Sequence, residues 1–223
     1  MGKDSGRNSS GVVVIGLGRF GAALAQELVE QDIEVLGIDG RPKIVQDLAP
    51  QLTHVVMADS TDEQALRQLS VHEFDRVVIG IGNDVEASIL TASLVLQMGV
   101  PNIWAKAISA AHARILAQLG VHHVVRPEHD MGQRVAHLVG GRMLDYIEFD
   151  EDFAMTKTSP PAAILGKPLR QTTVRSEHGI TVVAVKPPGG DFTYATEKTV
   201  VHPDDLIIVS GTLQDIARFS ELD

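Results

Sequence analysis

Cysteine is absent from the 223 residues of this chain. Disulfide bonds, thiolate metal ligands and cysteine nucleophiles are therefore excluded, and the composition fits a reducing cytoplasm. The chain also lacks any run of about 18 apolar residues, the length that a membrane-spanning helix needs. Its first ten residues contain no apolar segment of the kind found in a signal peptide, and we expect them to form a disordered tail.

Positive charge is scarce as well, because 19 Lys and Arg residues stand against 29 Asp and Glu residues, for a net charge of −10. Sequence-independent binding to nucleic acid or to anionic lipid requires a basic surface. We therefore expect no nucleic-acid binding and no direct lipid binding. The length leaves room for one large domain or two smaller ones.

One glycine-rich segment stands out because of the residues that surround it. An apolar run of strand length, Val12-Val13-Val14-Ile15, leads into Gly16-Leu17-Gly18-Arg19-Phe20-Gly21. Residues 22–31 have the pattern of a helix, and residues 34–38 that of a second strand, which Asp39 closes. This order of strand, glycine turn, helix and strand is typical of a βαβ unit that binds nucleotides.

The three glycines each have a physical role in such a turn. The first allows the tight turn, the second lets the backbone approach a pyrophosphate, and the third lets the helix pack on the strand. The phosphates then face the helix N-terminus, where free N–H groups and the positive end of the dipole favour an anion. Asp39 lies 18 residues beyond Gly21, close to the roughly 20 expected for the carboxylate that accepts ribose hydroxyls. The alternative is a glycine-rich turn in an ordinary α/β protein, and the flanking strand, helix and acid favour an adenine-nucleotide site.

Strand-like runs recur through the first 125 residues, with helical patterns between them. They lie at 12–15, 34–38, 54–57, 76–81, 102–107 and 123–125. Such alternation predicts an α/β fold, a Rossmann-like doubly wound parallel sheet of strand order 3-2-1-4-5-6, with the ligand above strands 1 and 4. Ser60 and Asn83 each precede a glutamate by three residues and are expected to cap two of the helices, and Ser109 a third.

The rest of the chain has a different sequence pattern. Pro127 suits a first helical position, and we expect a helix from there to about Tyr146, interrupted by a kink, a hinge or a close crossing at Gly140-Gly141. Strands are expected near 180–186, 192–196 and 206–209, and a final helix over 212–219. Residues 149–223 therefore predict a small α+β domain.

The sequence offers no convincing catalytic group. Tyr194 and Lys198 have the spacing of the tyrosine and lysine pair of short-chain dehydrogenases, but the segment between them is not helical, so the match is attributed to chance. The adjacent histidines 122 and 123 would point to opposite faces of a strand and would not chelate one metal. No GxSxG motif is present.

Three segments in order resemble the signature segments of RCK-domain proteins (regulator of potassium conductance). They are residues 16–21, Asn102-Ile103-Trp104-Ala105-Lys106-Ala107 and Arg126-Pro127-Glu128-His129-Asp130-Met131-Gly132. The chain is most similar to the cytosolic regulatory subunit of Ktr/Trk-type potassium uptake systems. The resemblance implies an RCK N-terminal domain at 11–126, a crossover or linker helix at 127–148 and an RCK C-terminal domain at 149–223.

The resemblance also implies a function without chemistry of its own. Such subunits form a homodimer and then an octameric ring that docks under a membrane-embedded potassium transporter, at the cytoplasmic face of the cell membrane. ATP or ADP sets the shape of the ring, with Mg²⁺ or Ca²⁺ at the phosphates.

Carried over position by position, the resemblance implies a set of nucleotide-binding residues. Arg19 and Lys106 would contact phosphates, Asp39 the ribose and Asp59-Ser60 the adenosine, while Glu128 would approach the phosphates across the dimer as the ligand of a divalent cation. The full set is Gly16, Gly18, Arg19, Phe20, Gly21, Asp39, Gly40, Arg41, Asp59, Ser60, Lys106 and Glu128.

The C-terminal domain is similar to a module that binds cyclic di-AMP in several relatives. The resemblance places Arg175 and His178 at the polar contacts of that site, and Ile164 and Ile180 at its apolar walls. A surface that only forms the dimer fits these residues equally well.

Two functions of different class therefore remain. One is a regulatory subunit of potassium uptake gated by nucleotide, and the other is a small NAD-dependent oxidoreductase. A dehydrogenase needs an acid or base and a substrate pocket in its second domain, and residues 149–223 offer no such set. The glycine turn and Asp39 bind parts that ATP, ADP and NAD(H) share, so the sequence does not separate these ligands.

Overall fold

The computed structural model describes residues 11–140, 143–150 and 152–222. The chain divides into two compact units between His129 and Asp130. The tail expected at residues 1–10 and the glycine at position 141 lie outside the described residues. Among the residues described, no helix is both long and apolar enough to cross a membrane.

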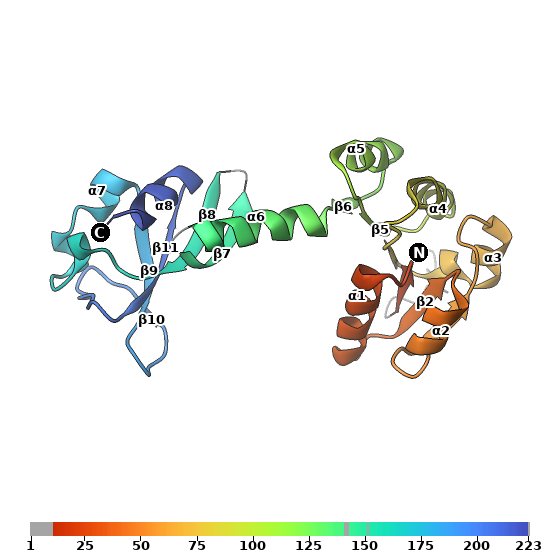
Figure 1. Ribbon diagram of the computed structural model, residues 1–223, viewed down its shortest axis with the longest axis horizontal. Helices are drawn as coiled ribbons and strands as arrows, with labels where there is room; N and C mark the ends of the chain where they lie inside the picture. The colour runs from red at the N-terminus through yellow and green to blue at the C-terminus, as the bar shows by residue number, and fades with distance from the viewer. Residues whose placement is uncertain (1–10, 141–142, 151, 223) are drawn as a thin grey trace, which may run out of the picture. The chain divides into compact units, whose positions relative to one another are not determined.

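The first unit is a parallel sheet covered by helices (Figure 1). Its strand order is β3-β2-β1-β4-β5-β6, as the alternation of strands and helices predicted. In chain order the elements are β1 (Val12–Ile15), α1 (Arg19–Glu30), β2 (Val35–Asp39), α2 (Pro42–Leu48), β3 (His54–Met57), α3 (Glu63–Gln68), the 3₁₀ turn η1 (Val71–Glu73), β4 (Arg76–Ile79), α4 (Val85–Gln97), β5 (Asn102–Lys106), α5 (Ala110–Leu119) and β6 (His123–Val125).

Both faces of this sheet are buried along its central strands β1, β2 and β4, which explains why these strands are largely apolar runs without alternation. Val12 and Val14 of β1 belong to one hydrophobic cluster, together with residues of α1 and α2. Val13 and Ile15 belong to the other, which includes residues of α4 and α5. Successive side chains of a strand point to opposite faces, so the four apolar residues of β1 serve two cores.

The helix caps differ in part from the prediction. Asp62 and Asp84 cap α3 and α4, accepting hydrogen bonds from the backbone N–H groups of Gln64 (2.8 Å) and Ala87 (2.9 Å). The prediction of Ser60 and Asn83 was wrong because the helices begin later, so the following glutamates lie too early in the first turn for a capping box. Ser109 caps α5 as expected.

The helix that begins at Pro127 is shorter than predicted. α6 (Pro127–Gly140) ends at the glycine pair, and the residues expected to continue it belong to a strand, β7 (Met143–Asp150). β7 pairs antiparallel with β8 (Phe153–Thr158), and this ladder replaces the last helical turns. The expectation of a helix to about Tyr146, and of a helical linker to 148, is therefore corrected. Glycine is unfavourable in a helix interior, and α6 ends at Gly140.

The second unit is a small α+β domain, as predicted. Its antiparallel sheet has the order β10-β9-β11-β8-β7. The other elements are the 3₁₀ turns η2 (Ala162–Ile164) and η3 (Leu169–Gln171), α7 (Val174–His178), β9 (Thr181–Lys186), β10 (Thr193–Tyr194), β11 (Leu206–Gly211) and α8 (Leu213–Ser220). The domain limits at 11–126 and 149–223 stay predictions.

Candidate nucleotide-binding site

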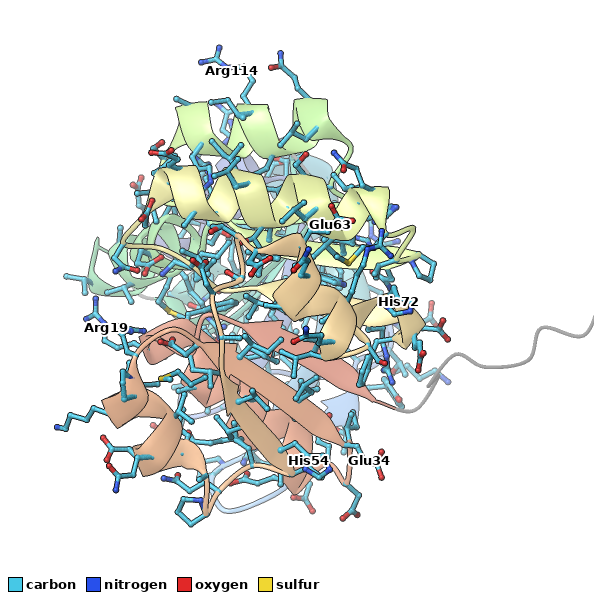
Figure 2. The ribbon with its side chains drawn as sticks, turned by 90° about the vertical axis from the view of Figure 1, so that its right-hand side faces the viewer. Arg19, Glu34, His54, Glu63, His72 and Arg114 are labelled. Carbon is cyan, nitrogen blue, oxygen red and sulfur yellow. The ribbon has the colours of Figure 1, made fainter. Side chains whose placement is uncertain are left out.

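A cavity of about 550 Å³ lies where β1, β2, β4 and β5 end. β1 stands between β2 and β4, so the connections that leave β1 and β4 turn to opposite faces of the sheet and leave a crevice between them. Figure 2 shows Arg19 at this edge of the sheet and Glu34 and His54 at the other. The fold thus provides a hollow at the position that the strand order predicted for a ligand.

The glycine turn after β1 forms one wall of the cavity. A Cβ atom on Gly21 would lie 2.0 Å from the carbonyl oxygen of Gly16, so the start of α1 is packed directly against the turn. Gly16 has a φ of +87°, which disfavours any side chain. A Cβ on Gly18 would meet nothing within 4 Å, and Gly18 borders the cavity. Gly16 and Gly21 therefore shape the turn, whereas Gly18 leaves room for a ligand's approach to the backbone.

A helix N-terminus and two basic side chains border the cavity beside the glycine turn. Gly18 is the N-cap residue of α1, which has no side-chain cap and no acidic residue in its first turn. The first N–H groups of this helix and the positive end of its dipole are therefore available to an anion. Arg19 and Lys106 line the same cavity. The arrangement fits the pyrophosphate of a nucleotide.

Asp39 stands at the other end, at the last position of β2. Its side chain is buried, and its carboxylate accepts hydrogen bonds from the backbone N–H of Leu17 (2.8 Å) and from the backbone and guanidinium of Arg41 (2.8–2.9 Å). Burial by itself raises the pKa of Asp39, but these hydrogen bonds outweigh burial and hold the pKa below its ordinary value. Asp39 is therefore ionised at neutral pH, as an acceptor for ribose hydroxyls must be.

Lys106 and Glu128 form an ion pair inside the cavity. The Lys106 ammonium also lies 5.7 Å from the centre of the Phe20 ring. The hydrogen bond from Lys106, together with the nearby charge of Arg19, lowers the pKa of Glu128. In the described part of the chain, no group of three or more His, Cys, Asp or Glu residues is placed to hold a metal ion. The cation predicted at Glu128 stays a prediction.

Most of the predicted nucleotide-binding residues come together in this one cavity. Its lining includes Gly16, Gly18, Arg19, Phe20, Asp39, Gly40, Arg41, Ser60, Lys106 and Glu128. Gly21 and Asp59 are absent from the lining: Gly21 packs behind the turn, and the exposed Asp59 accepts hydrogen bonds from the backbone and hydroxyl of Thr61.

The segment after β4, which the sequence did not predict as part of the site, forms another wall of the cavity. Gly80, Ile81, Gly82, Asn83 and Asp84 line the cavity, as does Ile108 after β5. A Cβ on Gly80 would lie 2.7 Å from the carbonyl oxygen of Gly16, so the two turns are in close contact. A signal was present, because the predicted strand order placed the ligand above strands 1 and 4, and this segment directly follows strand 4.

The second unit contains a cavity of about 460 Å³. Arg175 and Ile180 line it, together with polar groups that include Arg170 and Glu197. Of the other residues predicted for cyclic di-AMP, Ile164 is buried in the domain core, and the His178 ring lies edge-on to Phe219 at 6.2 Å. The cavity brings together two of the four.

Sequence comparison identifies the relatives of a chain with this fold and site. The sequence model of the TrkA-N domain matches residues 12–127, and that of the TrkA-C domain matches residues 157–222. Ktr system potassium uptake protein C of Bacillus subtilis (strain 168) is 36% identical over 209 residues, which cover 93% of this chain and 95% of the relative. The chain belongs to the Ktr/TrkA family of potassium uptake proteins.

A second Ktr-family relative gives the same result. Ktr system potassium uptake protein A of the same bacterium is 32% identical over 207 residues, covering 92% of this chain and 93% of the relative. The predicted resemblance to RCK-domain regulatory subunits of Ktr/Trk systems is confirmed.

Solved structures confirm the fold of this Ktr-family chain. The GsuK channel bound to NAD covers 100% of this chain and 40% of its own, at a TM-score of 0.64 and 18% identity. GsuK bound to ADP covers 56% of this chain and 33% of its own, at a TM-score of 0.50 and 17% identity. The chain spans less than half the length of these channel chains, and the likeness is one of fold.

Proposed function

We propose that this Ktr-family chain is a cytosolic regulatory subunit that controls potassium uptake through a membrane-embedded transporter, according to the adenine nucleotide it binds. The observation that carries the proposal is the cavity at the sheet's switch point. One end offers an uncapped helix N-terminus with Arg19 and Lys106, and the other offers the ionised carboxylate of Asp39. These features suit phosphates and a ribose, respectively.

ATP and ADP are the proposed ligands, and NAD(H) shares the parts that the site holds. In this arrangement the phosphates face Gly18 and Arg19, the ribose lies at Asp39, and the adenine extends toward Ser60. Glu128 lines the phosphate end, where a carboxylate would repel phosphate unless a cation lies between them. Mg²⁺ or Ca²⁺ bound jointly by the nucleotide and Glu128 would let the site distinguish ATP from ADP.

The proposed role is regulatory and not catalytic. Tyr194, of the pair that matches dehydrogenase spacing, lies in the strand β10 with its side chain 89% exposed, which argues against a catalytic pocket around it. The named relatives are potassium uptake proteins, and this argues for the regulatory subunit over the NAD-dependent oxidoreductase.

The chain is further proposed to form homodimers that assemble into an octameric ring at the cytoplasmic face of the cell membrane. Met131, Val135 and Val139 recur every fourth residue on α6 and are 55%, 45% and 82% exposed. Residues at this spacing share one face of a helix, and an apolar face of this kind favours burial against a partner. Cyclic di-AMP remains a proposed ligand of the second unit, where Arg175 and Ile180 line the cavity.

The test is calorimetry on nucleotide-free protein with ATP, ADP, NADH and cyclic di-AMP, followed by potassium uptake in proteoliposomes that hold the cognate transporter. We expect ATP and ADP to bind and to give different uptake rates. A matched pair of variants tests whether the effect arises at this site. Asp39→Ala should weaken the binding of both ATP and ADP. Asp47→Ala, which removes an exposed carboxylate on α2, should leave their binding unchanged. Failure of every adenine nucleotide to bind, or equal uptake with and without nucleotide, would contradict the proposal.

A further inference from the structure

The carboxylate of Asp39 is fully engaged by donors from its own chain. One oxygen accepts from the Leu17 backbone N–H and from Arg41 Nη2, both at 2.8 Å. The other accepts from the Arg41 backbone N–H and from Arg41 Nε, both at 2.9 Å. An ionised carboxylate offers about four lone-pair positions, so these four hydrogen bonds leave none for another donor.

Local backbone geometry accounts for this pairing. Asp39 ends β2, and Arg41 remains extended at φ −98° and ψ 115° before α2 begins at Pro42. A proline disfavours the helical conformation for the residue before it, which keeps Arg41 extended. Side chains two residues apart in an extended segment lie on the same side, so the guanidinium reaches the carboxylate as a bidentate fork.

The four donors differ in how readily they can leave. The two backbone N–H groups belong to Leu17 in the glycine turn and to Arg41 at the N-cap of α2, and the fold fixes their positions. The Arg41 side chain is 51% exposed. It can therefore turn into solvent, where water solvates its charge. If the ribose binds at Asp39, as the proposed function requires, its hydroxyls must take the two positions that the guanidinium holds.

We infer that Arg41 competes with the ribose of the nucleotide for Asp39, and thereby sets how tightly the site holds a ribonucleotide. The guanidinium is an internal ligand that the ribose hydroxyls displace. A nucleotide that lacks these hydroxyls has nothing to donate to Asp39 and leaves the pair intact. The competition therefore acts on the 2′- and 3′-hydroxyls alone.

The expected size of the effect is modest. A half-exposed ion pair is weak because solvent screens its charges, and its removal should strengthen ribonucleotide binding by about two- to fivefold. Arg41 also adds positive charge near an anionic ligand, so its loss weakens the binding of every nucleotide by a similar factor. The ratio of the Kd for 2′,3′-dideoxy-ATP to the Kd for ATP cancels this general effect and isolates the hydroxyls.

The test measures this ratio by calorimetry for the wild type and for Arg41→Ala, on the full chain. We expect the ratio to rise about two- to fivefold in Arg41→Ala. Arg41→Lys keeps the charge but not the fork of donors, and it should raise the ratio by a smaller factor. The control is Lys43→Ala, which removes an exposed charge of the same sign two residues away, outside the cavity lining, and should leave the ratio unchanged.

The outcomes separate this inference from the proposed function. A ratio that stays the same or falls in Arg41→Ala, while ATP still binds, overturns the competition and leaves the nucleotide site standing. Failure of the wild type and both Arg41 variants to bind ATP overturns both. Thermal melting of each variant shows that any loss of binding reflects the site and not the fold.

Discussion

Replacement of Asp39 by alanine tests the central feature of the nucleotide site. The carboxylate would accept hydrogen bonds from ribose hydroxyls, and bonds to a charged group are each worth about 1.5–3 kcal/mol. Displacing the half-exposed Arg41 side chain offsets up to about 1 kcal/mol of this gain. With two such bonds the net loss in Asp39→Ala is about 2 kcal/mol or more, which corresponds to a fall in affinity of more than about tenfold.

The same change affects stability, and the assay must separate the two effects. The Leu17 N–H loses its partner inside the protein, which costs about 1–3 kcal/mol. In a chain of this length each kcal/mol lowers Tm by about 2–4 °C, so the variant should remain folded at 25 °C if the wild type melts well above that temperature. Calorimetry with ATP and ADP at 25 °C then reports the site itself.

Asp39→Asn provides a second variant of nearly the same shape. It removes the negative charge and one acceptor oxygen while it preserves the packing around position 39. We expect it to lose affinity as Asp39→Ala does, and we also expect a fall in Tm, because the amide nitrogen would face N–H donors that a carboxylate oxygen accepted. If both variants bind ATP as tightly as the wild type, Asp39 does not hold the ribose and the reasoning is refuted.

Glu128, Gly21 and Val135 provide three further tests. Glu128→Gln should reduce the difference in potassium uptake between ATP and ADP, in the presence of Mg²⁺ and the cognate transporter, while ATP still binds; an unchanged difference would exclude the cation bridge. Gly21→Ala should lower the Tm, because its Cβ would lie 2.0 Å from the Gly16 carbonyl oxygen and overpacking costs about 1–3 kcal/mol or more; an unchanged Tm in a calorimetric scan would contradict this packing. Val135→Asp should weaken the proposed assembly through α6, since a charge would enter an apolar contact; light scattering at micromolar concentration should show smaller particles than for the wild type, and a wild-type monomer would refute the assembly.

Local signals were sufficient for the first half of the fold. The apolar run of β1, the glycine turn and Asp39 lie within one βαβ unit, where neighbours in sequence are neighbours in space. The alternation of strands and helices then predicted the parallel sheet and its order, because right-handed crossovers leave few ways to connect such units.

Local signals failed where pairing partners compete with propensity. Residues 143–146 were expected to extend α6, but Met143–Asp150 pairs with Phe153–Thr158 as β7 and β8. A ladder between two strands stabilises each of them only when both are present, so the sequence of one segment alone does not predict the pairing. The caps of α3 and α4 were also predicted wrongly, because each helix begins later than expected and an aspartate, Asp62 or Asp84, caps it.

The sequence by itself determined the glycine turn, the acid at the end of β2 and the kind of ligand they suit. Only the tertiary structure decided which other groups line the cavity beside them. Gly80 and Asp84 line the cavity because β4 pairs with β1. Lys106 contacts Glu128 because the last residue of β5 and the first turn of α6 lie beside the same cavity. The pairing of Arg41 with Asp39 depends on an extended backbone that the sequence only favours. Composition and spacing fix which residues the chain contains, whereas strand order and side-chain packing fix which of them meet.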